Sequence, residues 1–240
     1  MARHSLLVGK MLCFLVVAAG FVTFAGGAPA SAQDEAVLFA DDFRDDEIGK
    51  PPGKWKAEIV VNGVIEVVEA PELASGKAVR MIGDTERGET RIRAWLPDDP
   101  SLDEVTTIAI EHYVRFIRLG DGNFLYVHTS GNNLTWGFPN GEVIVNAGTT
   151  QRLGPLPDKM GWNRVRIVAN REKNELYIFV NDMEKPFSGP WSFRNPVASW
   201  RNGELQIQHS RRDNPPEVLY GDIKVWIVDD AITTYLWGDE

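Results

Sequence analysis

The stretch Leu38-Phe39-Ala40-Asp41-Asp42-Phe43-Arg44-Asp45-Asp46 alternates apolar and polar residues and then becomes strongly acidic. Regular alternation predicts a half-buried β-strand, which here leaves the core at a charged corner. The continuation Lys50-Pro51-Pro52-Gly53-Lys54-Trp55 is typical of a loop because of its prolines and glycine. Near the other end, Leu219-Tyr220-Gly221-Asp222-Ile223-Lys224-Val225-Trp226 alternates around a single acid. We expect these first and last strands to lie side by side and close a sandwich.

Residues 1–32 have the composition of a signal peptide. Arg3 and Lys10 make a basic start, residues 11–24 are apolar but too short for a membrane span, and residues 28–32 supply small side chains for a signal peptidase. We predict cleavage after Ala32 and export to the periplasm or the extracellular space, as in a bacterial exported protein. An uncleaved N-terminal anchor is the alternative.

Residues 33–240 have the size and composition of a single folded domain. Without Arg3 and Lys10 the basic residues fall from 25 to 23 against 34 acids, which gives a net charge of −11. Such an acidic chain is a poor partner for nucleic acid or anionic lipid. No later apolar run is long enough for a membrane span, so no membrane insertion is expected after cleavage. The single cysteine, Cys13, lies in the signal peptide, so a mature chain has no disulfide.

Short alternating segments separated by turn residues fill the rest of the chain. Asn62-Gly63 predicts a hairpin between residues 59–61 and 64–68, and residues 184–203 form an aromatic, proline-interrupted loop. The pattern predicts an all-β fold, a two-sheet antiparallel jelly-roll sandwich. The other predicted strands are residues 77–82, 90–96, 106–119, 124–128, 134–138, 143–145, 162–169, 176–180, 205–209 and 218–228, with 232–237 as a last edge strand.

The two end strands also carry a family resemblance. Phe39-Ala40-Asp41-Asp42-Phe43, the following Ile48-Gly49 and Trp55, and the closing Tyr220-Gly221-Asp222-Ile223-Lys224-Val225 resemble the concanavalin A-like jelly rolls of the laminin G and bacterial glycan-binding type. The resemblance implies a structural Ca²⁺ where the first and last strands meet, with Asp42 and Asp222 as ligands. The alternative is an acidic corner that binds no metal.

Members of this superfamily bind sugars on the concave sheet, and several residues here have suitable chemistry. Aromatic rings stack on sugars, while amide and guanidinium groups bind hydroxyls or uronate carboxylates. For any single aromatic residue, a place in the hydrophobic core is the alternative. The predicted ligand-binding residues are Arg91, Tyr126, His128, Trp136, Trp191, Trp200 and Gln208.

Arg91, His128 and Tyr220 also resemble, loosely, the arginine, histidine and tyrosine of jelly-roll alginate lyases, in which arginine neutralises the uronate carboxylate and histidine or tyrosine moves the proton. The chain departs from that pattern, because Ile92 replaces the acid expected between Arg91 and Arg93 and no glutamine stands two residues before His128. A retaining glycosidase would need two neighbouring carboxylates on one strand face, and no such pair is evident.

The sequence therefore favours an exported carbohydrate-binding, lectin-like module that recognises a polysaccharide or cell-envelope glycan. The first alternative is a jelly-roll polysaccharide lyase or glycoside hydrolase. A structural or protein-binding exported domain is the second.

Overall fold

The computed structural model of the chain describes residues 36–58, 62–83, 89–129, 131–210 and 213–238. These residues all belong to one compact unit, Asp34–Glu240. The predicted signal peptide, its cleavage point after Ala32 and the predicted strand at residues 59–61 lie outside the described residues. No helix in the described part of the chain is long and apolar enough to cross a membrane.

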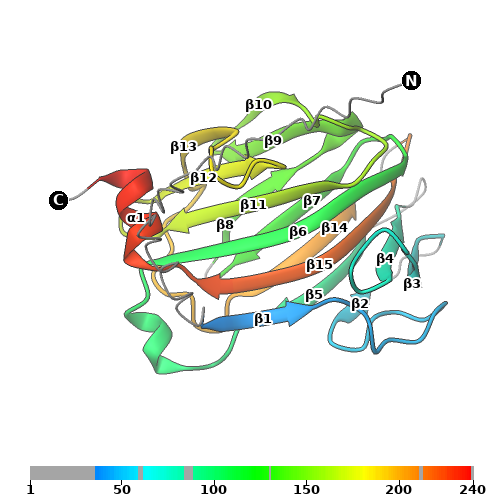
Figure 1. The fold of residues 1–240 in the computed structure, drawn as a ribbon, viewed down its shortest axis with the longest axis horizontal. Helices are drawn as coiled ribbons and strands as arrows, with labels where there is room; N and C mark the ends of the chain where they lie inside the picture. Colours follow the sequence, from blue (N-terminus) through cyan, green and yellow to red (C-terminus); the bar gives the residue numbers. More distant parts are fainter. Residues whose placement is uncertain (1–35, 59–61, 84–88, 130, 211–212, 239–240) are drawn as a thin grey trace, which may run out of the picture. The chain divides into compact units, whose positions relative to one another are not determined.

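Two antiparallel sheets pack into a sandwich, as the short alternating segments predicted (Figure 1). The eight-stranded sheet, called sheet A, has the order β13-β12-β11-β6-β15-β4-β3, and β1 pairs with β15 as well. The seven-stranded sheet, called sheet B, has the order β10-β9-β8-β7-β14-β5-β2. The strands of sheet A are β1 (Val37–Asp41), β3 (Val64–Glu69), β4 (Lys77–Ile82), β6 (Thr107–Arg118), β11 (Asn163–Asn170), β12 (Glu175–Val180), β13 (Ser188–Ser192) and β15 (Glu217–Ile227). Those of sheet B are β2 (Lys56–Glu58), β5 (Glu89–Trp95), β7 (Asn123–His128), β8 (Asn132–Gly137), β9 (Glu142–Ala147), β10 (Thr149–Pro155) and β14 (Glu204–Ser210).

The predicted pairing of the first and last strands is confirmed. β1 runs antiparallel to the second half of β15, with Ala40 opposite Lys224. The first half of β15 pairs with β4, and the other edge of β15 pairs with β6 (Figure 1). A β-bulge between Gly221 and Lys224 separates the two halves, and Asp222 lies in this bulge with a φ of 44°.

The core lies between the two sheets and is built from alternate residues of their strands. Ile92, Leu125 and Ile207 of sheet B and Ile110 and Val165 of sheet A are all buried there. Because side chains alternate along a strand, the neighbours of these sheet B residues point away from sheet A. The polar residues predicted to bind a ligand therefore lie on the outward face of sheet B.

The predicted last edge strand, residues 232–237, is wrong, because these residues form most of the helix α1 (Asp230–Trp237). The side chain of Asp229 accepts a hydrogen bond from the amide of Ile232 and caps the helix. Ile232, Leu236 and Trp237 then pack against the outer face of sheet A. Within the residues that the structure describes, the other helical segments are two short 3-10 helices, η1 (Pro100–Asp103) and η2 (Pro139–Gly141).

The hairpin predicted between residues 59–61 and 64–68 stays a prediction, because residues 59–61 lie outside the described part of the chain. The described strands on either side, β2 and β3, pair with β5 in sheet B and β4 in sheet A, respectively. One further expectation needs correction. The segment 184–203, expected to be a loop, contains the edge strand β13, which pairs with β12. Its prolines are compatible with an edge strand, where one side needs no ladder hydrogen bonds.

Candidate functional site

The outward face of sheet B brings together polar residues from three neighbouring strands. Gln208 of β14 lies between Arg91 of β5 and Phe124 of β7. One step along, Gln206 lies between Arg93 and Tyr126. Each residue therefore has its cross-strand neighbours on the same face of the sheet.

These strands surround a surface hollow of about 310 Å³, which we call the β14 hollow. The structure thus brings four of the predicted ligand-binding residues, Arg91, Tyr126, His128 and Gln208, to one place. Binding by these residues remains a prediction. The side chains that line the hollow are Glu89, Arg91, Tyr126, His128, Gln206 and Gln208.

The central strand of the hollow carries two glutamines that are nearly buried. Gln206 is 5% exposed and Gln208 is 7% exposed. The amide of Gln206 donates a hydrogen bond to the side-chain oxygen of Gln208, whose own amide donates to Ser210 Oγ at 3.0 Å. These bonds hold both amide planes in place, which prepares them to bind a ligand hydroxyl with little loss of side-chain entropy.

Aromatic side chains line the β7 side of the hollow. The rings of Tyr126 and His128 are stacked, with centroids 5.1 Å apart and 16° between their planes. Phe124 follows on the same strand, its ring centroid 6.2 Å from that of Tyr126. Rings of this kind offer apolar faces on which a sugar ring can stack.

Two arginines line up on the β5 side and share one carboxylate. Glu58 of β2 accepts hydrogen bonds from Arg91 Nε at 2.5 Å and from Arg93. The hydrogen bond from Arg91 holds the pKa of the Glu58 carboxyl below its usual value, so Glu58 is ionised at neutral pH. Arg91 and Arg93 also pair with Glu89 and Glu204, respectively.

A second hollow of about 290 Å³ is lined by Phe124, the cross-strand partner of Gln208. It also includes Ile144 of β9 and Arg152 of β10. In the strand register, a single row of partners crosses all seven strands of sheet B. The row runs Glu58, Arg91, Gln208, Phe124, Gly137, Ile144, Arg152. This row therefore contains residues that line both hollows on one face of the sheet.

Three of the predicted tryptophans lie elsewhere. Trp136, predicted on the sugar-binding face, and Trp200, predicted to reach the ligand from the loop 184–203, are both 0% exposed and belong to the core, so their predicted role in ligand binding is wrong. Trp136 faces inward from β8 and donates a hydrogen bond to His112. Trp191 lies on β13, an edge strand of the other sheet, where its indole nitrogen donates to Ser188 Oγ at 3.0 Å.

One exposed tryptophan on the correct face was missed. Trp95 ends β5, is 46% exposed, and lies on the same face as Arg91 and Arg93 because all three alternate along the strand. The guanidinium of Arg93 lies 5.9 Å from the centroid of its ring. Alternation along residues 89–95 was the signal that could have identified it.

The three residues predicted for a lyase, Arg91, His128 and Tyr220, do not lie in one site. Arg91 and His128 line the β14 hollow, whereas Tyr220 is fully buried between the sheets. The hydroxyl of Tyr220 lies 3.2 Å from Nε2 of His209, and burial raises the pKa of Tyr220. An inward-facing tyrosine cannot exchange a proton with a ligand in the hollow, so its predicted catalytic position is wrong.

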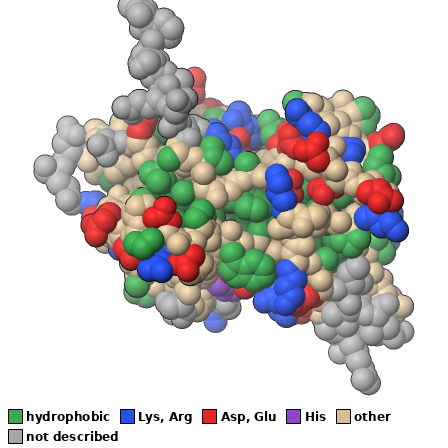
Figure 2. All heavy atoms as spheres, turned by 90° about the horizontal axis from the view of Figure 1, so that it is seen from below, with side chains coloured by type: hydrophobic (Ala, Val, Ile, Leu, Met, Phe, Trp, Pro, Cys, Tyr) green, Lys and Arg blue, Asp and Glu red, His purple; other side chains and the backbone are tan. Residues whose placement is uncertain are grey.

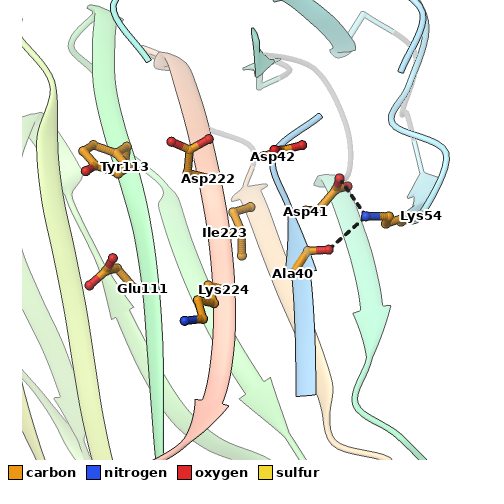
Figure 3. A pocket seen from close by; sticks show the side chains of 9 residues that line it. All are labelled: Ala40, Asp41, Asp42, Lys54, Glu111, Tyr113, Asp222, Ile223 and Lys224. Atoms are coloured by element: carbon orange, nitrogen blue, oxygen red, sulfur yellow. Dashed lines mark hydrogen bonds and ion pairs between the residues drawn. The ribbon is translucent and has the colours of Figure 1, made fainter. Parts of the chain in front are cut away.

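The predicted metal ligands Asp42 and Asp222 line one pocket of about 450 Å³ at the junction of β1 and β15 (Figure 3). Burial, followed by the charge of Asp42, raises the pKa of Asp222. Lys54 and Lys224 line the same pocket. Within the described ranges, no group of three or more His, Cys, Asp or Glu side chains is placed to hold a metal ion. Asp41 and Glu111 also line the pocket, but Asp41 pairs with Lys54 and Glu111 with two arginines, Arg164 and Arg166. Ca²⁺ takes six to eight oxygens, and calcium at Asp42 and Asp222 stays a prediction.

Comparison with known proteins shows a shared fold. No protein-family model and no curated protein matches the chain. A sialidase structure is similar with a TM-score of 0.63 and 11% identity over 81% of this chain, which spans only 19% of the sialidase chain. A carbohydrate esterase of the Shiga toxin-encoding bacteriophage phi24B gives a TM-score of 0.58 at 16% identity, covering 81% of this chain and all of the esterase chain (100%). The endo-β-1,4-glucuronan lyase of the fungus Trichoderma reesei gives 0.52 at 10% identity and covers 80% of this chain and 96% of the lyase. These similarities support the jelly-roll sandwich and, at such identities, nothing beyond the fold.

Proposed function

We propose that this chain is an exported carbohydrate-binding, lectin-like module of the concanavalin A-like type, and that its glycan binds in the β14 hollow. The observation that carries the proposal is the convergence of Arg91, Tyr126, His128, Gln206 and Gln208 around one hollow. Ligand sites of this kind combine aromatic surface with a few well-placed polar groups.

Each side of the hollow supplies one part of sugar recognition. Tyr126 and His128 provide stacked rings for the apolar face of a sugar. Gln206 and Gln208 provide amides for its hydroxyls. The continuation past Phe124 toward Arg152 gives room for further sugar residues. A polysaccharide crossing the strands would use all three features.

The comparisons are compatible with this proposal through the fold that they share with the chain. The similar structures include a carbohydrate esterase, a glucuronan lyase and a botulinum neurotoxin binding domain in complex with a sialylated ligand. Both carbohydrate enzymes and binding domains thus have this fold. The choice between the two functions therefore depends on the side chains of the hollow. With Tyr220 in the core, the lyase set is incomplete, which favours binding over cleavage.

A glycan array probed with the exported, purified protein tests the proposal, together with ultraviolet absorbance for the unsaturated products of a lyase. We expect glycan binding without new absorbance. The double variant Gln206→Ala with Gln208→Ala should abolish binding. Gln151→Ala is the matched control, because Gln151 lies on β10 of the same sheet outside the hollow.

Two other outcomes would contradict the proposal. Rising absorbance would identify an enzyme. Absence of binding to every glycan would favour a structural or protein-binding domain. The same array repeated with chelator tests the predicted calcium at Asp42 and Asp222, since loss of binding on calcium removal would support it.

A further inference from the structure

Fixed charges around the β14 hollow come in balanced pairs. Within the described residues, sheet B presents three cations on the β2 and β5 side of the hollow, and each contacts at least one carboxylate. The cations are Lys56, Arg91 and Arg93, and the carboxylates are Glu58, Glu89 and Glu204. The local formal charge of this set is therefore zero. Figure 2 views the molecule from below, and on that side too acidic and basic side chains lie next to one another.

Glu58 is the centre of this arrangement. Its two carboxylate oxygens receive Arg91 and Arg93 separately, and Lys56 Nζ lies 3.5 Å away. The side chain of Glu58 is 27% exposed, so these pairs are partly shielded from water. A carboxylate held by two neighbouring guanidinium groups occupies the place that a ligand carboxylate would need.

Two further carboxylates, Glu89 and Glu204, balance the remaining positive charge of the arginines. Arg91 Nη1 lies 3.4 Å from Glu89 Oε2, and Arg93 Nη1 lies 3.5 Å from Glu204 Oε2. A uronate entering the hollow would have to displace Glu58 from both arginines and would meet three fixed carboxylates. These carboxylates would repel the carboxylate of a ligand and so act against a uronate partner. The acidic balance of the whole chain, with a net charge of −9, adds to this repulsion.

The groups that line the centre of the hollow suit an uncharged ligand. Gln206 and Gln208 donate and accept hydrogen bonds without a net charge. Tyr126 and His128 add the stacked rings. Hydroxyl groups of a sugar can bind to these side chains without breaking any of the ion pairs around Glu58.

We infer that the ligand of the β14 hollow is an uncharged glycan, and that Glu58 excludes polyuronates by occupying Arg91 and Arg93. This inference rests on the proposed glycan-binding function and adds the class of ligand and the residue that selects it.

Isothermal titration of the full protein tests the inference, with neutral β-glucan and xylan oligosaccharides on one side and oligouronates on the other. We expect binding of at least one neutral series and at least about tenfold weaker binding of the oligouronates. Glu58→Gln should raise the affinity for oligouronates by about tenfold or more, in a manner that added salt reduces. Its affinity for the neutral ligand should stay within about twofold.

Glu66→Gln is the matched control, because Glu66 of β3 pairs with Arg80 of β4 in sheet A, away from the β14 hollow. It likewise removes one carboxylate from an arginine pair and should leave the ligand preference unchanged. Glu204→Gln is a second test variant in case Glu58→Gln unfolds, and it should shift the preference in the same direction by a smaller factor, because Glu204 pairs with one of the two arginines, Arg93, whereas Glu58 pairs with both.

Preference of the unchanged protein for oligouronates would overturn the inference while leaving the proposed glycan binding intact. No change in oligouronate affinity in a folded Glu58→Gln protein would also overturn the role of Glu58. If neither ligand class binds, the proposed function itself is rejected, and the inference with it.

Discussion

The indole Nε1 of Trp136 donates a hydrogen bond to Nε2 of His112 at 3.2 Å, across the core between the two sheets. A second bond of the same kind joins His209 of sheet B to Tyr220 of sheet A, also at 3.2 Å. All four side chains are fully buried. Buried imidazoles are stable there only in the neutral form, which links the stability of the sandwich to pH.

Acid should therefore destabilise this fold. Burial lowers the pKa of His112 from 6.5 to about 4 and that of His209 to about 3. Below pH 6.5 the unfolded chain binds protons that the folded chain does not, so stability falls as the pH falls toward these values. Each pKa unit is worth about 1.4 kcal/mol, so His112 alone costs about 3 kcal/mol by pH 4. Urea unfolding at pH 7, 6 and 5 measures this trend, and a free energy of unfolding that rises toward pH 5 would contradict it.

Two tryptophan substitutions should separate stability from binding. Trp95→Ala removes an exposed ring beside the β14 hollow and should weaken glycan binding without lowering the melting temperature. Trp136→Phe leaves His112 without its donor and should cost about 1 to 3 kcal/mol of stability while the folded fraction still binds. Thermal melts and glycan titrations of both variants check this. Weaker glycan binding by folded Trp136→Phe, with unchanged binding by Trp95→Ala, would instead identify Trp136 as a ligand contact.

Tyr220→Phe tests whether the buried hydroxyl has any role in chemistry. The variant loses the contact with His209 and should be about 1 kcal/mol less stable. Glycan affinity should not change, because Tyr220 faces the core. Clearly weaker glycan binding by a folded variant would contradict this prediction. So would the loss of a lyase activity found in the unchanged protein, because either result would give Tyr220 a role in binding or catalysis.

The acidic pocket at β1 and β15 makes a prediction about Asp222. Its carboxylate is partly buried near Asp42, and its φ of 44° is one that asparagine adopts more readily than most residues. Asp222→Asn should therefore raise the melting temperature by a few degrees in the presence of chelator. A calcium-dependent rise in the melting temperature of the unchanged protein, absent from the variant, would instead support the calcium prediction.

Much of the fold followed from the alternation of apolar and polar residues. Alternation predicted both β1 and β15 as strands, and their expected pairing is confirmed, with Asp41 at the end of β1 opposite Ile223, next to Asp222 in the middle of β15. It failed for residues 232–237, since so short a segment has too few residues to distinguish a helix from a strand. The capping role of Asp229 was the missing signal.

The candidate site was predicted in part for the same reason. Arg91, Tyr126 and Gln208 alternate with buried apolar residues, so their outward position could be inferred. Trp136 lies on the same strand face as Leu134 and Phe138. A face made only of apolar residues indicates the core rather than a ligand site. The role of Glu58 depends on the pairing of β2 with β5, a contact between distant segments that no local pattern reveals.

The most direct test of the account is a heteronuclear NMR titration of the protein with a neutral glycan that it binds. The account predicts that the signals that shift most belong to the β14 hollow, above all the side-chain amides of Gln206 and Gln208 and the backbone around Tyr126 and His128. The opposite outer face, around α1 and the pocket at Asp222, should remain unchanged. Shifts confined to that face, with the β14 hollow unaffected, would contradict the account.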